Sequence, residues 1–225
     1  MISHYYTDIQ GWSDGIDLLY KRMVELAPGA QSSGYAYTGD SFVLQPATTA
    51  PLVHYVEIGS WRGRSTAYMC VEIANSGKNI KFDAVDTWAG SIDEPEHQND
   101  PSVVNDTLYN EFLANLEPVK QYVTPVRMTS TEAAATYADN TLDFVFIDAQ
   151  HDYDSVHADI LAWWPKVKIG GIIAGHDYNP GPDENGVDYG VGKAVRELLP
   201  EHQPIPWCWA LQKMSEAQLR HGNTL

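Results

Sequence analysis

The sequence has few basic residues and few cysteines. Lysine and arginine together number 14, against 30 aspartates and glutamates, and the formal net charge is −16. A protein that follows a nucleic-acid backbone needs an extended basic surface, so we expect no nucleic-acid partner. The two cysteines, Cys70 and Cys208, lie far apart without metal-ligand spacing, which favours buried free thiols. This cysteine usage fits a reducing compartment, and the predicted location is cytoplasmic.

Long apolar runs are also missing. No stretch approaches the length of a membrane span, and residues 1–8 lack the basic-then-apolar pattern of a signal peptide, so we expect no membrane contact. The 225 residues, 44% hydrophobic and 20% charged, are enough for one sizeable core. We expect an N-terminal cap segment over residues 1–50 and one main domain over residues 51–225. The composition leaves open whether the chain forms a homo-oligomer.

From residue 52 onward, apolar runs alternate with helical patterns. The expected strands span residues 52–58, 80–86, 122–128, 142–148 and 170–174, and the expected helices span 63–75, 105–116, 129–137, 153–164 and 192–199. Residues 204–213 suit terminal strands. Earlier in the chain, a helical pattern over residues 9–26 precedes a loop over 31–41. Apolar strands separated by helices predict an α/β fold with a mostly parallel sheet covered on both faces.

Glycine and acidic residues follow the ends of these strands, where ligands bind in open parallel sheets. The first strand ends at Gly59, and the turn continues through Gly63 into a helix. Such a turn lets a ligand approach unpaired backbone N–H groups. Asp86 ends the second strand, 27 residues after Gly59, where a carboxylate can accept both hydroxyls of a ribose. The alternative is an aspartate that only caps a turn or helix.

The type of nucleoside follows from residue 61. A dinucleotide-binding turn needs a second glycine where this chain has Trp61, and no phosphate-binding lysine loop is present. A ligand without phosphates, such as S-adenosylmethionine, fits this turn better. Glu57, just before the turn, can then support the cationic end of the ligand directly or through water.

Four segments together resemble a known family. They are residues 56–65 (VEIGSWRGRS), 86–88 (DTW), 146–153 (FIDAQHDY) and 170–178 (GGIIAGHDY). Their order resembles the class I S-adenosylmethionine-dependent methyltransferases, over about residues 50–200. More narrowly, they are similar to the small bacterial O-methyltransferases related to the macrocin- and cephalosporin-modifying enzymes. The resemblance implies a Rossmann-like, doubly wound sheet, here with an N-terminal helical cap.

The resemblance also implies roles for individual residues. It puts the Gly59 turn under the methionine part of the cofactor, Trp88 near the adenine, and Ser130 with Thr131 at the adenine edge. The expected cofactor-binding residues are Glu57, Gly59, Ser60, Trp61, Gly63, Ser65, Asp86, Thr87, Trp88, Ser130, Thr131 and Asp148. Asp148 and Asp177 correspond to positions that bind a divalent metal in the metal-dependent members.

The chemistry of these strand ends supports a metal and a base. Asp148 and Asp177 can chelate Mg²⁺, which would lower the pKa of an acceptor hydroxyl. His176 as a third ligand would favour a softer ion such as Mn²⁺. The alternative is that the two aspartates cap turns. His151, three residues after a strand end, is the expected catalytic base; the alternative is a solvent-exposed residue at a helix start.

Two polar inserts, residues 90–106 and 179–189, follow the expected site and are predicted to set substrate specificity. Their acids suit a hydroxylated or cationic acceptor, or else form a solvated surface: Asp93, Glu94, Glu96, Asp183, Glu184 and Asp188.

The predicted function is methyl transfer from S-adenosylmethionine to a hydroxyl of a small molecule, such as a sugar or polyhydroxylated metabolite. The first alternative is a nicotinamide-dependent oxidoreductase, which Trp61 argues against. The second is a non-catalytic nucleoside-binding module, which His151 and the paired aspartates argue against.

Overall fold

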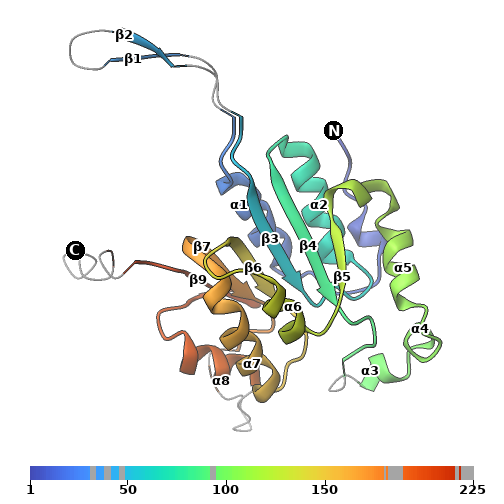
Figure 1. Cartoon of the computed structure of the whole chain (residues 1–225). Helices are drawn as coiled ribbons and strands as arrows, with labels where there is room; N and C mark the ends of the chain where they lie inside the picture. Colours follow the sequence, from blue (N-terminus) through green and yellow to red (C-terminus); the bar gives the residue numbers. More distant parts are fainter. Residues whose placement is uncertain are drawn as a thin grey trace.

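A seven-stranded sheet forms the centre of the computed structural model, which describes residues 1–30, 34–37, 42–45, 49–91, 95–179, 181, 190–215 and 218 (Figure 1). The strands of this sheet are β3 (Val53–Ile58), β4 (Ile80–Asp86), β5 (Thr124–Arg127), β6 (Leu142–Ile147), β7 (Val167–Gly175), β8 (Gln203–Ile205) and β9 (Cys208–Gln212). Their order is β5-β4-β3-β6-β7-β9-β8. Strands β3 to β7 pair in parallel, and β9 is antiparallel to both neighbours. The predicted fold class is confirmed.

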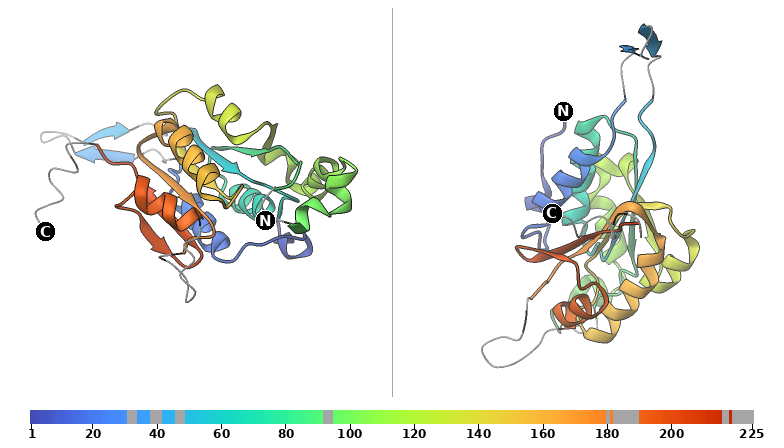
Figure 2. Two further views of the ribbon diagram at one scale, coloured as in Figure 1. Left: turned by 90° about the horizontal axis from the view of Figure 1, so that it is seen from below. Right: turned by 90° about the vertical axis from the view of Figure 1, so that its left-hand side faces the viewer.

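Helices cover both faces of the sheet, as Figure 2 shows. They are α1 (Ile16–Leu26), α2 (Arg64–Ser76), α3 (Pro95–Gln98), α4 (Pro101–Val104), α5 (Leu108–Asn115), α6 (Ser130–Thr136), α7 (Tyr153–Trp163) and α8 (Gly190–Leu198). Apolar residues of α1, α2 and α5 share one core with the sheet, and those of α6, α7 and α8 share the other. Within β3, Tyr55 faces the first core and Val56 the second, as the two-residue period of a strand requires.

The sheet register brings several strand ends to one level. Ile58, the last residue of β3, pairs with Val85 of β4 on one side and Ile147 of β6 on the other. Ile147 in turn pairs with Gly175 of β7. The chain leaves β3 first toward β4 and later returns to the other side of β3, so the strand order reverses there. The residues that follow β3, β4, β6 and β7 therefore meet at one edge.

The N-terminal region differs from the sequence prediction in two places. The helix expected over residues 9–26 begins only at Ile16, because Gly15 adopts a left-handed φ of 80° that interrupts the helical pattern. The loop expected over residues 31–41 contains a strand, β1 (Gly34–Tyr37), which pairs antiparallel with β2 (Phe42–Gln45). The other residues of that range lie outside the described part. Figure 1 shows the hairpin projecting away from the main sheet. The division at residue 50 stays a prediction.

Other boundaries also differ from the prediction, most of them by one to three residues. The helix expected from residue 105 begins at Leu108 and follows the separate turn α4. The strand expected from residue 122 begins at Thr124, because a 3-10 helix with proline in its first turn occupies Glu117–Tyr122. The strand expected from residue 170 begins at Val167. Within the described residues, no helix is long and apolar enough to cross a membrane.

Candidate active site

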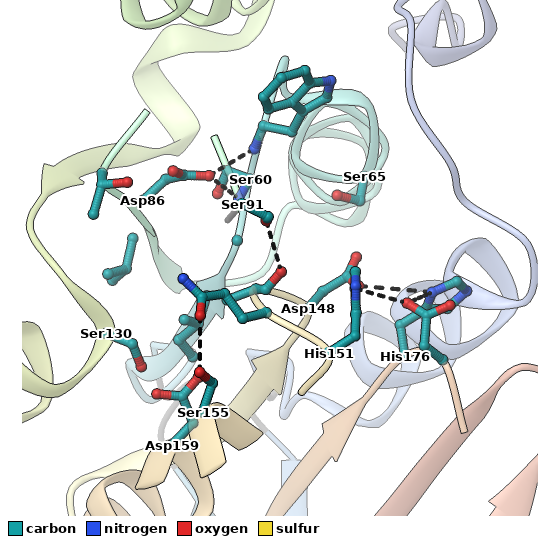
Figure 3. A pocket seen from close by; sticks show the side chains of 18 of the residues that line it. Ser60, Ser65, Asp86, Ser91, Ser130, Asp148, His151, Ser155, Asp159 and His176 are labelled. Atoms are coloured by element: carbon teal, nitrogen blue, oxygen red, sulfur yellow. Dashed lines mark hydrogen bonds and ion pairs between the residues drawn. The ribbon is translucent and has the colours of Figure 1, made fainter. Parts of the chain in front are cut away.

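A cavity of about 660 Å³ opens where β3, β4, β6 and β7 end, and Figure 3 shows it from close by. Most of the predicted site residues line this cavity: Gly59, Ser60, Trp61, Ser65, Asp86, Thr87, Ser130, Thr131, Asp148, His151, His176 and Asp177. Glu57, Gly63 and Trp88 do not line it. Residues that are far apart in the sequence therefore line one cavity. Glu57, Gly63 and Trp88 are the exceptions, and each has a physical reason.

Gly59 allows the ends of β3 and β6 to meet. Its φ is 86°, and a Cβ added there would overlap the carbonyl oxygen of Asp148. The Asp148 N–H donates to the Ile58 carbonyl at 2.8 Å, which fixes this close approach. A side chain at residue 59 would therefore push apart the two strand ends that form the floor of the cavity.

Asp86 holds the turn from the side of β4. Its carboxylate accepts the backbone N–H groups of Ser60 and Trp61 at 2.8 Å and that of Trp88 at 2.7 Å (Figure 3 draws the bonds to the turn). Trp61 and Trp88 have φ values of 47° and 53°, a left-handed conformation that costs a bulky residue roughly 1–2 kcal/mol. Burial raises the pKa of Asp86, and the N–H bonds oppose that rise. Two carboxylate oxygens offer about four acceptor positions, which leaves room for a ligand hydroxyl.

Glu57 lies beneath the turn and is fully buried. It accepts hydrogen bonds from the Tyr20 hydroxyl at 2.7 Å, the Ser60 hydroxyl at 2.9 Å and the hydroxyl groups of Ser65 and Thr66. Burial raises the pKa of Glu57, and the hydroxyl groups oppose that rise. These bonds tie α1 and the start of α2 to the turn. The structure thus places Glu57 outside the lining, and any effect on a ligand would have to pass through a residue such as Ser60.

The other two exceptions belong to the core. Trp88 is fully buried; its ring centre lies 4.7 Å from that of Phe112, and its Nε1 donates to the Trp61 carbonyl at 2.9 Å. Its ring is therefore not offered to an adenine in the cavity. Gly63 caps the start of α2 with a φ of 86°, and a Cβ there would lie 3.0 Å from Phe112. Its role is to let the helix begin close to α5.

Two histidines and two aspartates gather at the cavity, and Figure 3 labels Asp148, His151 and His176 at one side of it. His151 Nε2 lies 3.2 Å from Asp177 Oδ2. His176 Nδ1 lies 2.9 Å from the same oxygen and 3.7 Å from Asp148 Oδ1. The other ring nitrogen of His176, Nε2, lies 3.0 Å from the carbonyl oxygen of Asp14. Since a carbonyl can only accept, His176 donates there, and its Nδ1 faces two carboxylates.

The charges of this group follow from its geometry. Burial raises the pKa of Asp148 to about 6, although the neighbouring His176 opposes that rise. Burial alone would raise the pKa of Asp177, but hydrogen bonds with His151 and His176 outweigh it and hold that pKa well below its usual value. Burial alone would lower the pKa of His176, but the bond to Asp177 and the charge of Asp148 raise it to about 9. His176 is thus an imidazolium at neutral pH.

The same group could hold a metal ion. One ligand atom each from Asp148, His151 and Asp177 lies within 4.8 Å of the others. The sequence prediction chose His176 as the third ligand. In the structure, both ring nitrogens of His176 are engaged, with Asp177 and the Asp14 carbonyl, so the residues that could chelate an ion include His151 in its place.

The opposite side of the cavity is formed by α6 and α7. Ser130 and Thr131 begin α6, behind the N-cap Thr129. Facing them are residues of α7 that the sequence prediction missed, Ser155 and Asp159. Their i, i+4 spacing puts both on one helix face, a signal that could have been used.

Further wall residues carried no sequence signal for a binding site. They come from the irregular N-terminal segment at Gln10, Gly11, Trp12 and Asp14 and from Trp207 near the C-terminus. His97 also lines the cavity, and its ring stacks on Trp61 at 3.8 Å. The first insert therefore reaches the site. The acids Asp93, Glu94, Asp183, Glu184 and Asp188, and the side chain of Glu96, lie outside the described residues.

Comparison with protein families adds a direct finding. A family model described as a methyltransferase domain matches residues 56–178. Among curated proteins, the uncharacterized protein y4gI of Sinorhizobium fredii is 29% identical over 122 residues. That match covers 54% of this chain but only 13% of the length of y4gI.

Several solved structures share the fold. The O-methyltransferase NovP has a TM-score of 0.58 at 17% identity, over 88% of this chain and 79% of NovP. A protein from Corynebacterium glutamicum has a TM-score of 0.54 at 13% identity, over 93% of this chain and 85% of that one. The cofactor-bound protein Rv0187 from MTB has a TM-score of 0.50 at 18% identity, over 92% and 82% of the two chains.

Proposed function

The chain belongs to this family of methyltransferase domains, and on that premise we propose that it transfers a methyl group from S-adenosylmethionine to a hydroxyl of a small molecule. One observation carries the proposal. A single cavity joins Asp86, suited to a ribose, to the group of Asp148, His151 and Asp177, suited to proton transfer. Methyl transfer requires the donor and the acceptor to meet in one space, which this cavity provides.

The cavity fits the cofactor in size and chemistry. Its volume of about 660 Å³ lies within the usual range for small-molecule sites, about 300–1,000 Å³. Asp86 retains acceptor capacity for a ribose hydroxyl beside the turn that it holds. Trp61, stacked on His97, stands where a dinucleotide-binding turn needs glycine. These features favour a nucleoside without a pyrophosphate.

The residues of the chain supply orientation and a proton acceptor. S-adenosylmethionine supplies an electrophilic methyl group when it is bound. His151 would accept the proton of the acceptor hydroxyl through one ring nitrogen, while Asp177, 3.2 Å from Nε2, orients the ring and stabilises the resulting imidazolium. Asp177 is ionised at neutral pH, because its pKa is held low. The transfer is an in-line displacement, so most of the rate enhancement would come from positioning.

A divalent metal is a second element of the proposal, supported by the spacing of the carboxylates. Asp148 and Asp177 would hold Mg²⁺ or Mn²⁺, and the ion would lower the pKa of an acceptor hydroxyl. His151 can also reach such an ion, and its nitrogen would favour Mn²⁺. A histidine bound to the ion through Nε2 cannot take a proton at that atom, so in the metal-bound form the ion would take over the activation of the hydroxyl.

The proposal gives only the chemical class of the methyl acceptor. We infer a hydroxylated small molecule, such as a sugar or polyhydroxylated metabolite, because Trp12, Trp207 and carboxylates border the cavity. A cytoplasmic location, the lack of a nucleic-acid or membrane partner, and homo-oligomer formation stay predictions.

Binding and turnover together test the proposal. Titration calorimetry should detect binding of S-adenosylhomocysteine and no binding of NADH. Label from methyl-labelled S-adenosylmethionine should then appear on at least one member of a panel of hydroxylated acceptors. His151→Gln should lower metal-free kcat by about 10²–10⁴-fold with little change in cofactor affinity. His157→Gln, on α7 but outside the cavity lining, is the matched control.

The outcomes separate the alternatives. Binding of NADH without binding of S-adenosylhomocysteine would favour an oxidoreductase. Binding of S-adenosylhomocysteine with no transfer to any acceptor of the panel would favour a non-catalytic module. A His151→Gln variant with full metal-free turnover would remove that residue from the role of base.

A further inference from the structure

The cavity contains a buried carboxyl group that the proposed reaction does not use. Asp159 of α7 is only 5% exposed, yet it lines the cavity together with Ser130 and Ser155. Figure 3 shows these three residues on one side of the cavity, with His151 and His176 on the other. Asp159 therefore lies across the cavity from the group assigned to proton transfer.

The partners of Asp159 leave it with spare acceptor capacity. The Ser130 hydroxyl donates a hydrogen bond to Asp159, and Ser130 Oγ itself accepts from Trp163 Nε1 at 2.9 Å. The Trp163 contact directs the serine proton toward the carboxyl group. Burial raises the pKa of Asp159 to about 6, with the Ser130 bond opposing that rise, so most of the group is ionised at pH 7 and above. In the described part of the chain, no lysine, arginine or histidine forms an ion pair with it.

A buried carboxylate with one hydroxyl partner is costly unless another donor reaches it. The start of α6 offers only hydroxyl side chains at the cavity, Ser130 and Thr131, because Glu132 and the Thr129 side chain bond to each other in the helix cap. Asp159 is consequently the strong acceptor on this side. A neutral planar group with N–H donors on its edge would satisfy it. The exocyclic amine of adenine is such a group.

We propose that Asp159 is a specificity-determining residue for the cofactor, and that its carboxylate accepts a hydrogen bond from the exocyclic amine of the adenine. Ser130 is a positioning residue, which fixes one carboxylate oxygen so that the other faces the ligand. Asp86 then takes the ribose of the same nucleoside. The inference rests on the proposed function, because it assigns a residue to the adenine of S-adenosylmethionine.

The proposal predicts discrimination between purines. Hypoxanthine carries a carbonyl where adenine carries its amine, so two acceptors would face each other and the buried carboxylate would lose its donor. A site built to hydrogen-bond a ligand group rejects an analogue that lacks the group more strongly than an apolar pocket does. We expect S-inosylhomocysteine to bind about 10–100-fold more weakly than S-adenosylhomocysteine at pH 8.

Calorimetric Kd values of the full chain for these two ligands test the proposal. In Asp159→Asn, the amide can turn either its oxygen to the amine or its nitrogen to the carbonyl, so the ratio of the two Kd values should fall to within about threefold. Ser130→Ala frees the carboxylate and should reduce the ratio in part. Asp154→Asn, an exposed substitution on the same helix, should keep the wild-type ratio.

Each result has a defined meaning. Equal affinity of the wild-type chain for both ligands would overturn the proposal and leave the proposed function standing. An Asp159→Asn variant that binds both ligands more weakly but keeps the wild-type ratio would also overturn it, because a purely structural residue has that effect. If Asp159→Asn does not fold, the Ser130→Ala ratio decides. Failure of the wild-type chain to bind S-adenosylhomocysteine at all would instead overturn the proposed function.

Discussion

Replacing Asp86 by alanine should destabilise the fold as well as the cofactor site. The substitution removes the acceptor of three backbone N–H groups, those of Ser60, Trp61 and Trp88, which lie 2.7–2.8 Å from the carboxylate. Leaving a buried donor unpaired costs about 1–3 kcal/mol. Water entering the cavity can satisfy part of the loss, so we expect the free energy of unfolding to fall by about 3–6 kcal/mol.

Differential scanning calorimetry without ligand measures this effect. In a chain of this length, 1 kcal/mol changes Tm by about 2–4 °C, so Asp86→Ala should lower Tm by roughly 10–20 °C. Asp86→Asn keeps one acceptor oxygen for the turn and should lower Tm by less. Glu117→Ala is the matched control, because its ion pair with Lys120 lies at the surface and contributes about 1 kcal/mol or less.

Two results would refute this reasoning. A Tm of Asp86→Ala within about 2 °C of the wild type would mean that the carboxylate does not hold the left-handed turn. A test of the ribose role needs a variant of Asp86 that still folds. Loss of the turn would weaken cofactor binding whether or not Asp86 contacts the ribose. Unchanged affinity of folded Asp86→Asn for S-adenosylhomocysteine would therefore contradict the ribose role.

Three further predictions concern the strand ends. Gly59→Ala should prevent cofactor binding and lower Tm far more than Gly77→Ala, because both glycines have positive φ but only the Cβ at residue 59 would overlap Asp148; equal losses would contradict this. His176 has a pKa raised from 6.5 to about 9, so its stabilising charge is complete below pH 6.5 and is lost as pH rises through 9. Tm should thus fall between pH 7 and 10 more steeply in the wild type than in His176→Gln, and equal slopes would contradict this. If Asp148 and Asp177 hold an ion, Mn²⁺ should raise Tm and EDTA should reverse the rise, while Asp177→Asn should not respond; a wild-type chain indifferent to both additions would argue against the metal.

The meeting of the strand ends could be predicted from the sequence, because the carboxyl ends of neighbouring parallel strands lie at the same edge of a sheet. Apolar runs showed where each strand stops, and residues that follow neighbouring strands share one edge. Ile58 pairs with Val85 and with Ile147, so Gly59, Asp86 and Asp148 had to lie close together. The same regularity made the fold class predictable, and the strand order confirms it. The family was indicated separately by the resemblance of four segments to methyltransferases, and the family match confirms it.

Side-chain directions and irregular segments were not predictable in this way. Trp88 follows a strand end like its neighbours, but a left-handed backbone turns its ring into the core against Phe112. Trp12 and Trp207 also form walls of the cavity. They fall within segments predicted as a helix and as terminal strands, but the structure places both outside regular elements, so no predicted strand end linked them to the site. The paired strands β1 and β2 were not predicted, because Gly, Ser and Tyr are common both in loops and in edge strands.

The number of donors that the chain itself supplies differs between three carboxylates at and beneath the cavity. Glu57 receives hydroxyl bonds from four residues, Asp86 receives three backbone N–H bonds, and Asp159 receives one hydroxyl bond. Glu57 is saturated and lies outside the cavity lining, whereas the other two line the cavity with acceptor capacity left over. Substitutions should follow the same order: Glu57→Gln should change stability more than cofactor affinity, Asp86→Asn should change both, and Asp159→Asn should change base preference most.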